Sequence, residues 1–178
     1  MVMLWNEEEV NIQTTSQSRW PIHAVVTAKF HRPWIMSTIY ASTNKVCRKR
    51  LWDEVNGVGG IQDTERMVMG DLNTIGSGKE KVGGRKPTAN QLEELKNVMN
   101  KNGLIDLGAH GPKWTWKNKR VSLANIKERL SRVMANVMWC NRFANAQVSH
   151  LPYFNSDHRV ILVDLEPKKE FRHRPYRL

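Results

Sequence analysis

The sequence has few cysteines and no long apolar run, and both absences restrict the classes of protein to which it can belong. Cys47 and Cys140 are its only cysteines, and neither is part of a CxxC pair or a Cys/His cluster. This scarcity argues against a zinc site or a disulfide framework and favours two ordinary thiols in a reducing compartment. No apolar stretch is long enough to cross a membrane, and the acidic segment Glu7–Glu9 does not resemble a secretory signal. We therefore expect an intracellular protein with no membrane partner.

Acidic residues are also scarce. The chain has 17 Asp and Glu against 28 Lys and Arg, which gives a formal net charge of +11. An excess of this size favours a polyanionic partner, which is most often nucleic acid and less often an anionic membrane. A nucleic-acid partner is compatible with a nuclear location.

Stretches rich in β-branched and aromatic residues alternate with amphipathic segments, which predicts strands and helices in one domain. One helix is expected to open at a capping box formed by Thr88 and Gln91 and to stop at Gly103. The other expected helices are 44–55 and 137–143. The expected strands are 1–5, 23–30, 34–40, 67–69, 104–107, 114–116, 128–135, 145–150 and 160–163, and the last, being nearly all apolar, should be buried. We expect a domain at 1–166 and a basic linker or tail at 167–178.

A short apolar run leads into Gly70, Asp71, Leu72 and Asn73. If the backbone continues as a strand, the side chains of Asp71 and Asn73 point to the same side and can converge on one ligand. The alternative is a plain turn, since Gly, Asp and Asn each favour tight reversals. A second polar group, Ser156-Asp157-His158, comes directly before the apolar strand expected at 160–163.

Together these two groups supply the parts that metal-assisted hydrolysis of a phosphate ester needs. Carboxylates hold Mg²⁺ and orient and deprotonate a water molecule, while an imidazole stabilises charge on the phosphate. Each group alone is a weak signal, because an Asp-His pair such as Asp157-His158 is more often a cap or a surface pair.

Residues 76–86 form a Gly-rich basic loop that contains Lys81, Arg85 and Lys86. The loop lacks the Gly-Lys-Ser/Thr ending of a phosphate-binding Walker motif, so it is either plain flexible surface or a weaker contact to phosphate. Trp114 and Trp116 flank Thr115; such residues either pack in a core or stack on a base or sugar.

In this order, the motifs resemble the endonuclease/exonuclease/phosphatase family, and more narrowly the apurinic-type endonuclease domain of plant LINE-type (non-LTR) retrotransposons. The resemblance covers most of the chain. The residues that carry it are Ile39–Ser42, Met69–Asn73, Lys81–Arg85, Gly103–Gly108, Gly111–Asn118, Glu128–Arg132 and Ser156–His158.

The resemblance implies a four-layer α/β sandwich in which two packed sheets are flanked by helices. It implies that Asp71 orients the attacking water with help from Asn73, that His158 contacts the scissile phosphate, and that Tyr40 donates to a phosphate oxygen. Asp157 would serve the metal or tune the imidazole, and Asp71 would be a further metal contact.

The implied cofactor is Mg²⁺ or Mn²⁺. The implied partner is nucleic acid, in particular DNA, and full-length relatives carry a downstream reverse transcriptase domain. Nucleic-acid contacts are expected from Lys81, Arg85, Lys86, Trp116 and Lys117.

The chain departs from the family pattern in two ways. The family opens with a strand that ends in Asn and then a strand that carries its principal metal-ligating Glu, and this chain is expected to start after both. The family segment Arg-Leu-Asp-Arg reads Arg129-Leu130-Ser131-Arg132, so the carboxylate that orients the catalytic imidazole is replaced by a hydroxyl. The sequence thus predicts a weak or inactive endonuclease-like domain. Three alternatives stay open: an active Mg²⁺-dependent endonuclease, a non-catalytic nucleic-acid-binding module, and a phosphoesterase of the same family.

Overall fold

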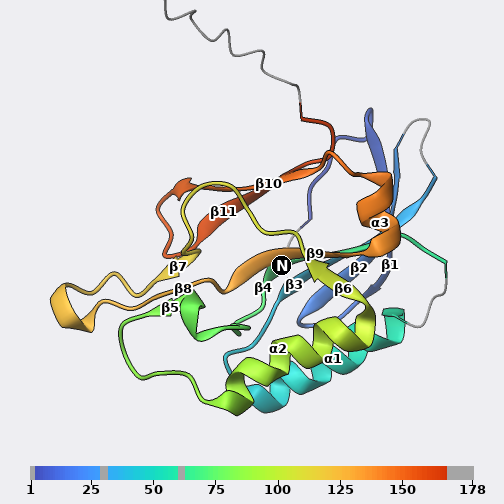
Figure 1. Ribbon diagram of the computed structural model, residues 1–178. Helices are drawn as coiled ribbons and strands as arrows, with labels where there is room; N and C mark the ends of the chain where they lie inside the picture. Colours follow the sequence, from blue (N-terminus) through green and yellow to red (C-terminus); the bar gives the residue numbers. More distant parts are fainter. Residues whose placement is uncertain (1–2, 29–31, 60–62, 168–178) are drawn as a thin grey trace, which may run out of the picture.

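The centre of the molecule is a six-stranded mixed sheet, seen in the computed structural model, which describes residues 3–28, 32–59 and 63–167 (Figure 1). Its strand order is β1-β2-β3-β4-β9-β6. Strands β3 and β4 pair in parallel, and every other neighbouring pair in this sheet is antiparallel. The bounds are β1 Val10–Gln17, β2 Pro21–Ala28, β3 Trp34–Tyr40, β4 Arg66–Asp71, β6 Leu104–Asp106 and β9 Ser131–Asn136.

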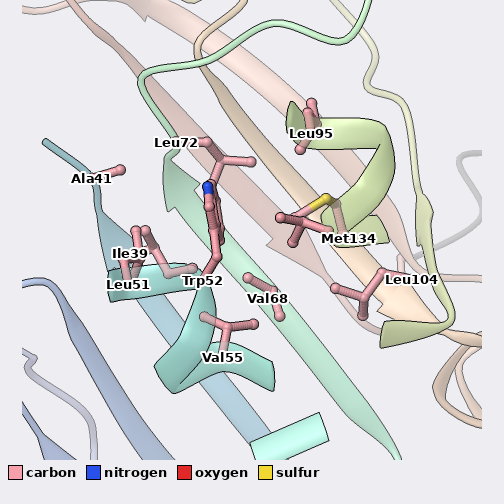
Figure 2. Close-up of a cluster of buried hydrophobic side chains, with 11 residues drawn as sticks. Ile39, Ala41, Leu51, Trp52, Val55, Val68, Leu72, Leu95, Leu104 and Met134 are labelled. Carbon is pink, nitrogen blue, oxygen red and sulfur yellow. The ribbon is translucent and has the colours of Figure 1, made fainter. Parts of the chain in front are cut away.

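Two helices, α1 (Lys45–Gly59) and α2 (Ala89–Asn102), cover one face of this sheet (Figure 1). The predicted capping box is confirmed, because the Thr88 and Gln91 side chains each bond the other's backbone, and Gly103 ends α2 with a left-handed φ of 58°. A hydrophobic core fills the space between helices and sheet (Figure 2). Its buried residues are Ile39, Ala41, Leu51, Trp52, Val55, Val68, Leu72, Leu95, Val98, Leu104 and Met134.

The opposite face of the sheet packs against a smaller two-stranded antiparallel sheet, β10 (Gln147–Tyr153) and β11 (Arg159–Asp164), and against the short helix α3 (Val137–Arg142). The second core lies here and includes Val26, Trp34, Met67, Val133, Ala135, Trp139, Phe143 and Val148. Central strands face both cores because side chains alternate: on β4, Met67 belongs to the second core and Val68 to the first. The expected α/β class, with two packed sheets and helices, is thus confirmed.

A third, three-stranded sheet closes one end of the molecule, with the order β5-β8-β7. Its strands are only two residues long: β5 Lys81–Val82, β7 Trp116–Lys117 and β8 Lys127–Glu128. Two single-turn 3₁₀ helices, η1 (Gly78–Glu80) and η2 (Ser122–Ala124), lie in its connections. None of the helices among the described residues is both long and apolar enough to cross a lipid bilayer.

Several sequence-based expectations about strands were wrong. Residues 3–5 of the strand expected at 1–5 have no regular structure, and β1 forms instead from a largely exposed polar segment whose composition hid it. The strand expected at 128–135 is interrupted at residues 129 and 130, between β8 and β9. At 114–116 only Trp116 enters a strand. Residues 29 and 30 of the strand expected at 23–30 and the predicted tail beyond Pro167 lie outside the described residues.

The expectation that residues 160–163 form a fully buried strand was also wrong. Strand β11 packs one side onto the second core through Ile161 and Val163, whereas Val160 and Leu162 are 51% and 48% exposed. The reason is that the second core covers one face of β11, whereas the other face, which carries Val160 and Leu162, stays exposed. An all-apolar run therefore formed a strand that is buried on one face only.

Candidate active site

The candidate site begins at the end of β4, where Gly70 brings the chain into contact with β3. Gly70 has a φ of +132°, and a Cβ built on it would lie 2.0 Å from the carbonyl oxygen of Ile39. Only glycine accepts this backbone conformation and this close approach without strain. Gly70 therefore sets the direction in which Asp71 leaves the sheet.

The substitution Gly70→Ala is expected to lower the free energy of unfolding by about 2–3 kcal/mol, because the added methyl group strains the backbone and forces β3 and β4 apart. Urea denaturation followed by circular dichroism measures the change. Gly57→Ala is the matched control, since Gly57 lies in α1 with no atom within 4 Å of the new Cβ. The control should gain about 0.5–1 kcal/mol from its better helix propensity. A Gly70 variant as stable as the control would contradict the account.

Asp71 and Asn73 converge, but by a turn and not by strand spacing. Strand β4 ends at Asp71, and Asn73 has a left-handed φ of 45°. The backbone N–H of Asn73 donates to Asp71 Oδ1 at 3.0 Å, and Asn73 Nδ2 donates to Asp71 Oδ2 at 3.0 Å and to the Ala41 carbonyl at 2.8 Å. The turn and the converging site were alternatives in the sequence, and the structure contains both in one motif. Asn73 thereby fixes the carboxylate of Asp71.

The second polar group approaches from the start of β11. A backbone bridge joins Trp116 and His158, and the Trp116 indole N–H donates to Asp157 Oδ2 at 2.9 Å. The Ser156 hydroxyl accepts from the backbone N–H of His158 at 3.0 Å. These contacts hold Asp157 and His158 at the rim where β4 ends and β11 begins.

The two groups meet across a shallow cleft of about 480 Å³. His158 Nε2 lies 3.7 Å from Asp71 Oδ2, and Asp157 and the largely exposed Tyr40 also line the cleft. Asp71 itself is only 8% exposed. Sequence reasoning about Asp71, Asn73, Asp157, His158 and Tyr40 thus named residues that the fold brings to one place.

The two carboxylates of the cleft have pKa values that shift in opposite directions. Burial raises the pKa of Asp71, although the Asn73 N–H and the nearby His158 oppose that shift and Asp157 adds to it. The pKa of Asp157 is lowered, chiefly by the hydrogen bond from the Trp116 indole. Two acids held at different pKa values are a usual feature of sites that move protons.

Ser131 stands behind the imidazole. Its Oγ lies 3.4 Å from His158 Nδ1, a long and weak contact by hydrogen-bond criteria. Ser131 is 5% exposed and sits at the first position of β9. The serine noted in the sequence therefore occupies the position from which a carboxylate would orient the ring.

Sequence reasoning missed the residue that holds this part of β9, which is Thr115. Thr115 is fully buried, and its Oγ1 accepts from the backbone N–H groups of Leu130 and Ser131, both at 2.9 Å. In the sequence, the two neighbouring tryptophans indicated roles for the indole rings, and no local pattern indicated a role for the threonine hydroxyl. Its role follows only from tertiary structure.

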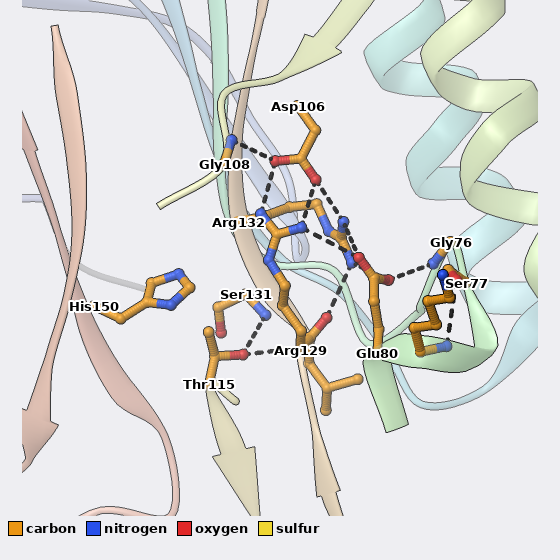
Figure 3. Close-up of polar contacts among 12 residues, drawn as sticks. Gly76, Ser77, Glu80, Asp106, Gly108, Thr115, Arg129, Ser131, Arg132 and His150 are labelled. Atoms are coloured by element: carbon orange, nitrogen blue, oxygen red, sulfur yellow. Dashed lines mark hydrogen bonds and ion pairs between the residues drawn. The ribbon is translucent and has the colours of Figure 1, made fainter. Parts of the chain in front are cut away.

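A group of four ion-paired residues, Glu80, Asp106, Arg129 and Arg132, lies beside this strand (Figure 3). Asp106 accepts from both nitrogens of the Arg129 fork at 2.7 Å and from Arg132 Nη1 at 2.7 Å. Glu80 accepts from Arg132 Nη2 at 2.9 Å and from Arg129 Nη1 at 3.1 Å. Each carboxylate also accepts a hydrogen bond from a backbone N–H, Asp106 from Gly108 and Glu80 from Gly76. This ion-pair network joins η1, β6 and β9, and it was not expected from the sequence.

No protein-family model matches the sequence, and no curated protein matches it. Solved structures do match. The endonuclease domain of TRAS1, a telomere-specific non-LTR retrotransposon, is 12% identical with a TM-score of 0.68, and the match covers 90% of this chain and 70% of that one. The fold is that of the endonuclease/exonuclease/phosphatase proteins. The human Nocturnin catalytic domain (13% identical, TM-score 0.52, 88% and 59% covered) and a family member from Bacteroides thetaiotaomicron (11%, 0.52, 91% and 69%) share it.

The endonuclease/exonuclease/phosphatase fold places the cleft at the rim of two sheets, yet the residues here do not make a resident metal site. Within the described parts of the chain, no three His, Cys, Asp or Glu side chains are grouped so that they could hold a cation. Asp71 and Asp157 are the two carboxylates that line the cleft. Because Asp71 is already bonded by Asn73 and faces His158, this donor set does not fit a metal held by the protein alone.

Three of the residues expected to contact nucleic acid have partners within the chain. Lys81 pairs with Glu128 at 2.5 Å, and the Lys117 ammonium lies 4.2 Å from the centre of the Tyr153 ring. The indole N–H of Trp116 is committed to Asp157. Arg85 and Lys86 are exposed.

Proposed function

We propose that this chain is a retroelement-derived, endonuclease-type domain that binds a DNA phosphodiester across the Asp71–His158 cleft and hydrolyses it weakly. The observation that carries the proposal is the convergence of Asp71, Asp157, His158 and Tyr40 on one cleft. Asn73, which does not line the cleft, holds the Asp71 carboxylate from behind. Support also comes from a fold shared with a retrotransposon endonuclease domain. In relatives of this kind we expect a reverse transcriptase to follow the domain in the same protein.

In the proposed reaction, Asp71 accepts a proton from a water molecule whose oxygen attacks phosphorus while a P–O ester bond breaks. Its raised pKa suits this role, because a general base works best when its pKa lies near the working pH. Asn73 keeps the carboxylate oriented. His158, facing the cleft, and the Tyr40 hydroxyl stabilise the charge that develops on the phosphate oxygens.

Weak hydrolysis follows from two features of the site. The described residues do not group three metal-ligating side chains, so the cation chemistry of the family is not supported by this chain alone. Ser131 gives the imidazole a long contact without charge, so neither the tautomer nor the orientation of His158 is fixed as a carboxylate would fix it.

A nicking assay tests the proposal. Supercoiled plasmid and an abasic duplex are incubated with the chain in Mg²⁺ or Mn²⁺, and Asp71→Ala and His158→Ala variants are purified in parallel. Slow nicking is expected from the natural sequence, with a loss of about tenfold or more, down to background, in each variant. Equal nicking by all three proteins would show that the activity does not come from this cleft.

A non-catalytic nucleic-acid-binding module is the second candidate, favoured by the net charge of +11 and by Ser131. Salt-sensitive DNA binding without nicking, unchanged in Asp71→Ala, would favour it. Hydrolysis of a small phosphodiester such as bis(p-nitrophenyl) phosphate, with no binding of DNA, would instead favour a phosphoesterase.

A further inference from the structure

A second depression adjoins the Asp71–Asn73 turn and is lined by Asn73, whereas the cleft is lined by Asp71. The volume of this depression is about 180 Å³, and its lining includes Arg48, Asn73, Lys81, Arg85 and Lys86. A water molecule takes up about 30 Å³ in the liquid, so the depression is several times larger than one water. A phosphate group with a partial water shell therefore fits this basic pocket.

The charges around the basic pocket are not all neutralised. Arg48 is bound by Glu94 through two contacts of 2.7 and 3.0 Å, and Lys81 is paired with Glu128. Among the described residues, neither Arg85 nor Lys86 has an ion-pair partner. The pocket thus keeps two uncompensated positive charges, which favour a bound anion.

Arg48 and Lys81 give this pocket a fixed wall. Arg48 Nη1 also donates to the carbonyls of Ser42 and Thr43 at 3.1 and 2.8 Å, and its side chain is only 9% exposed. The Lys81 ion pair joins β5 to β8. The pocket therefore combines two basic side chains held in fixed positions, Arg48 and Lys81, with two exposed ones, Arg85 and Lys86. Lysines scattered over a surface would not form such an ordered site.

The basic pocket and the cleft are neighbours along the same two chain segments. Asn73 and Leu130 line the pocket, while Asp71 and Ser131, which are close to them in sequence, line the cleft. The Asn73 side chain also bonds the Asp71 carboxylate. An extended ligand that occupies both depressions must pass over this turn.

We propose that the basic pocket binds a second phosphate of the DNA strand whose scissile phosphate lies in the cleft. The inference rests on the proposed function and narrows its substrate class: the ligand carries phosphates at regular intervals, so it is a polynucleotide and not a small phosphoester. Arg85 and Lys86 are the residues that neutralise this second phosphate.

The test is the salt dependence of binding to a fluorescein-labelled DNA duplex, measured by anisotropy. Loss of one phosphate contact in the double variant Arg85→Ala/Lys86→Ala should weaken binding about tenfold at low salt. It should also reduce the slope of log K against log salt by about one unit. Thermal unfolding should be unchanged, because both side chains are exposed.

The matched control is Lys96→Ala/Lys101→Ala, which removes the same charge from exposed positions of α2 outside the pocket. If the natural sequence binds DNA and both double variants lose affinity equally, the pocket is not a phosphate site, while the proposed function stands. If the natural sequence does not bind DNA at low salt, the proposed function and this inference both fail. A loss of affinity confined to the Arg85/Lys86 variant supports the pocket.

Discussion

Replacing Asp106 with alanine is expected to lower the free energy of unfolding by about 3–5 kcal/mol, the usual cost of removing one partner from a buried ion pair. Asp106 accepts from both Arg129 and Arg132. Without Asp106, the two guanidiniums share the single carboxylate of Glu80, and their side chains are only 13% and 2% exposed, so the uncompensated positive charge is poorly hydrated. Chemical denaturation at neutral pH measures the effect.

Glu93→Ala is the control for Asp106→Ala. Glu93 pairs with Lys96 on the surface of α2, where both side chains are 52% exposed, and such a pair contributes less than about 1 kcal/mol. A loss in the Asp106 variant no larger than in the Glu93 variant would mean that the ion-pair network contributes little to stability.

The ion-pair network should also make stability depend on pH. Hydrogen bonds and charges from Arg132 and Arg129 hold the pKa values of Glu80 and Asp106 below their ordinary values of 4.5 and 3.8, although burial opposes the shift. A lowered folded-state pKa contributes stability that is complete above the ordinary pKa and is lost as the pH falls through the folded value. Unfolding free energy should therefore decline below about pH 4.5, and less steeply in Asp106→Ala.

Ser131→Asp is expected to raise the rate of DNA nicking by about 10–100-fold, the usual range for a group that orients a functional imidazole. Ser131 Oγ already lies 3.4 Å from His158 Nδ1, and a carboxylate one atom longer reaches the ring. An aspartate at position 131 accepts a hydrogen bond from the Nδ1–H of His158, so Nε2 is the ring nitrogen that faces the cleft. Its negative charge also stabilises the imidazolium form of the ring. The nicking assay described above, run across a range of pH, measures the gain and any change in the pH profile.

The variant Ser131→Asn is the control that separates the effect of the aspartate's charge on the nicking rate from the effect of its size and shape. Asparagine has nearly the same volume as aspartate but no charge, so it should leave the nicking rate close to that of the natural sequence. Equal rates for the two variants, with the same pH profile, would show that position 131 does not act through the charge of a carboxylate.

Local patterns predicted the parts of the fold that depend on local physics. The strand at 34–40 and the capping box of α2 follow from propensity and short-range hydrogen bonds, and both are confirmed. Strand β1 was missed because its sequence is mostly polar and exposed, and its alternation of apolar residues ends after Val10 and Ile12. Strand β11 was misjudged because the burial of each face depends on whether another layer packs on it, which a single segment does not encode.

The sequence was sufficient to name residues of the candidate site, but it could not predict how these residues are arranged in space. Asp71, Asn73, Asp157 and His158 were named from motifs whose order resembles a known family, whereas their convergence requires the end of β4 and the start of β11 to lie at one rim. Thr115 and the ion-pair network could not be found in this way. Their partners lie far apart in the chain, as with Glu80 and Arg132, which are separated by 52 positions.

Strand β9 has a further consequence for motion at the cleft. Neighbouring residues on a strand point to opposite faces, so Ser131 lines the cleft while Arg132 anchors the ion-pair network behind it. A local opening that breaks the Arg132 contacts must also displace Ser131 relative to His158. The lifetime of the cleft's shape is therefore controlled by the ion-pair network, whose residues do not line the cleft.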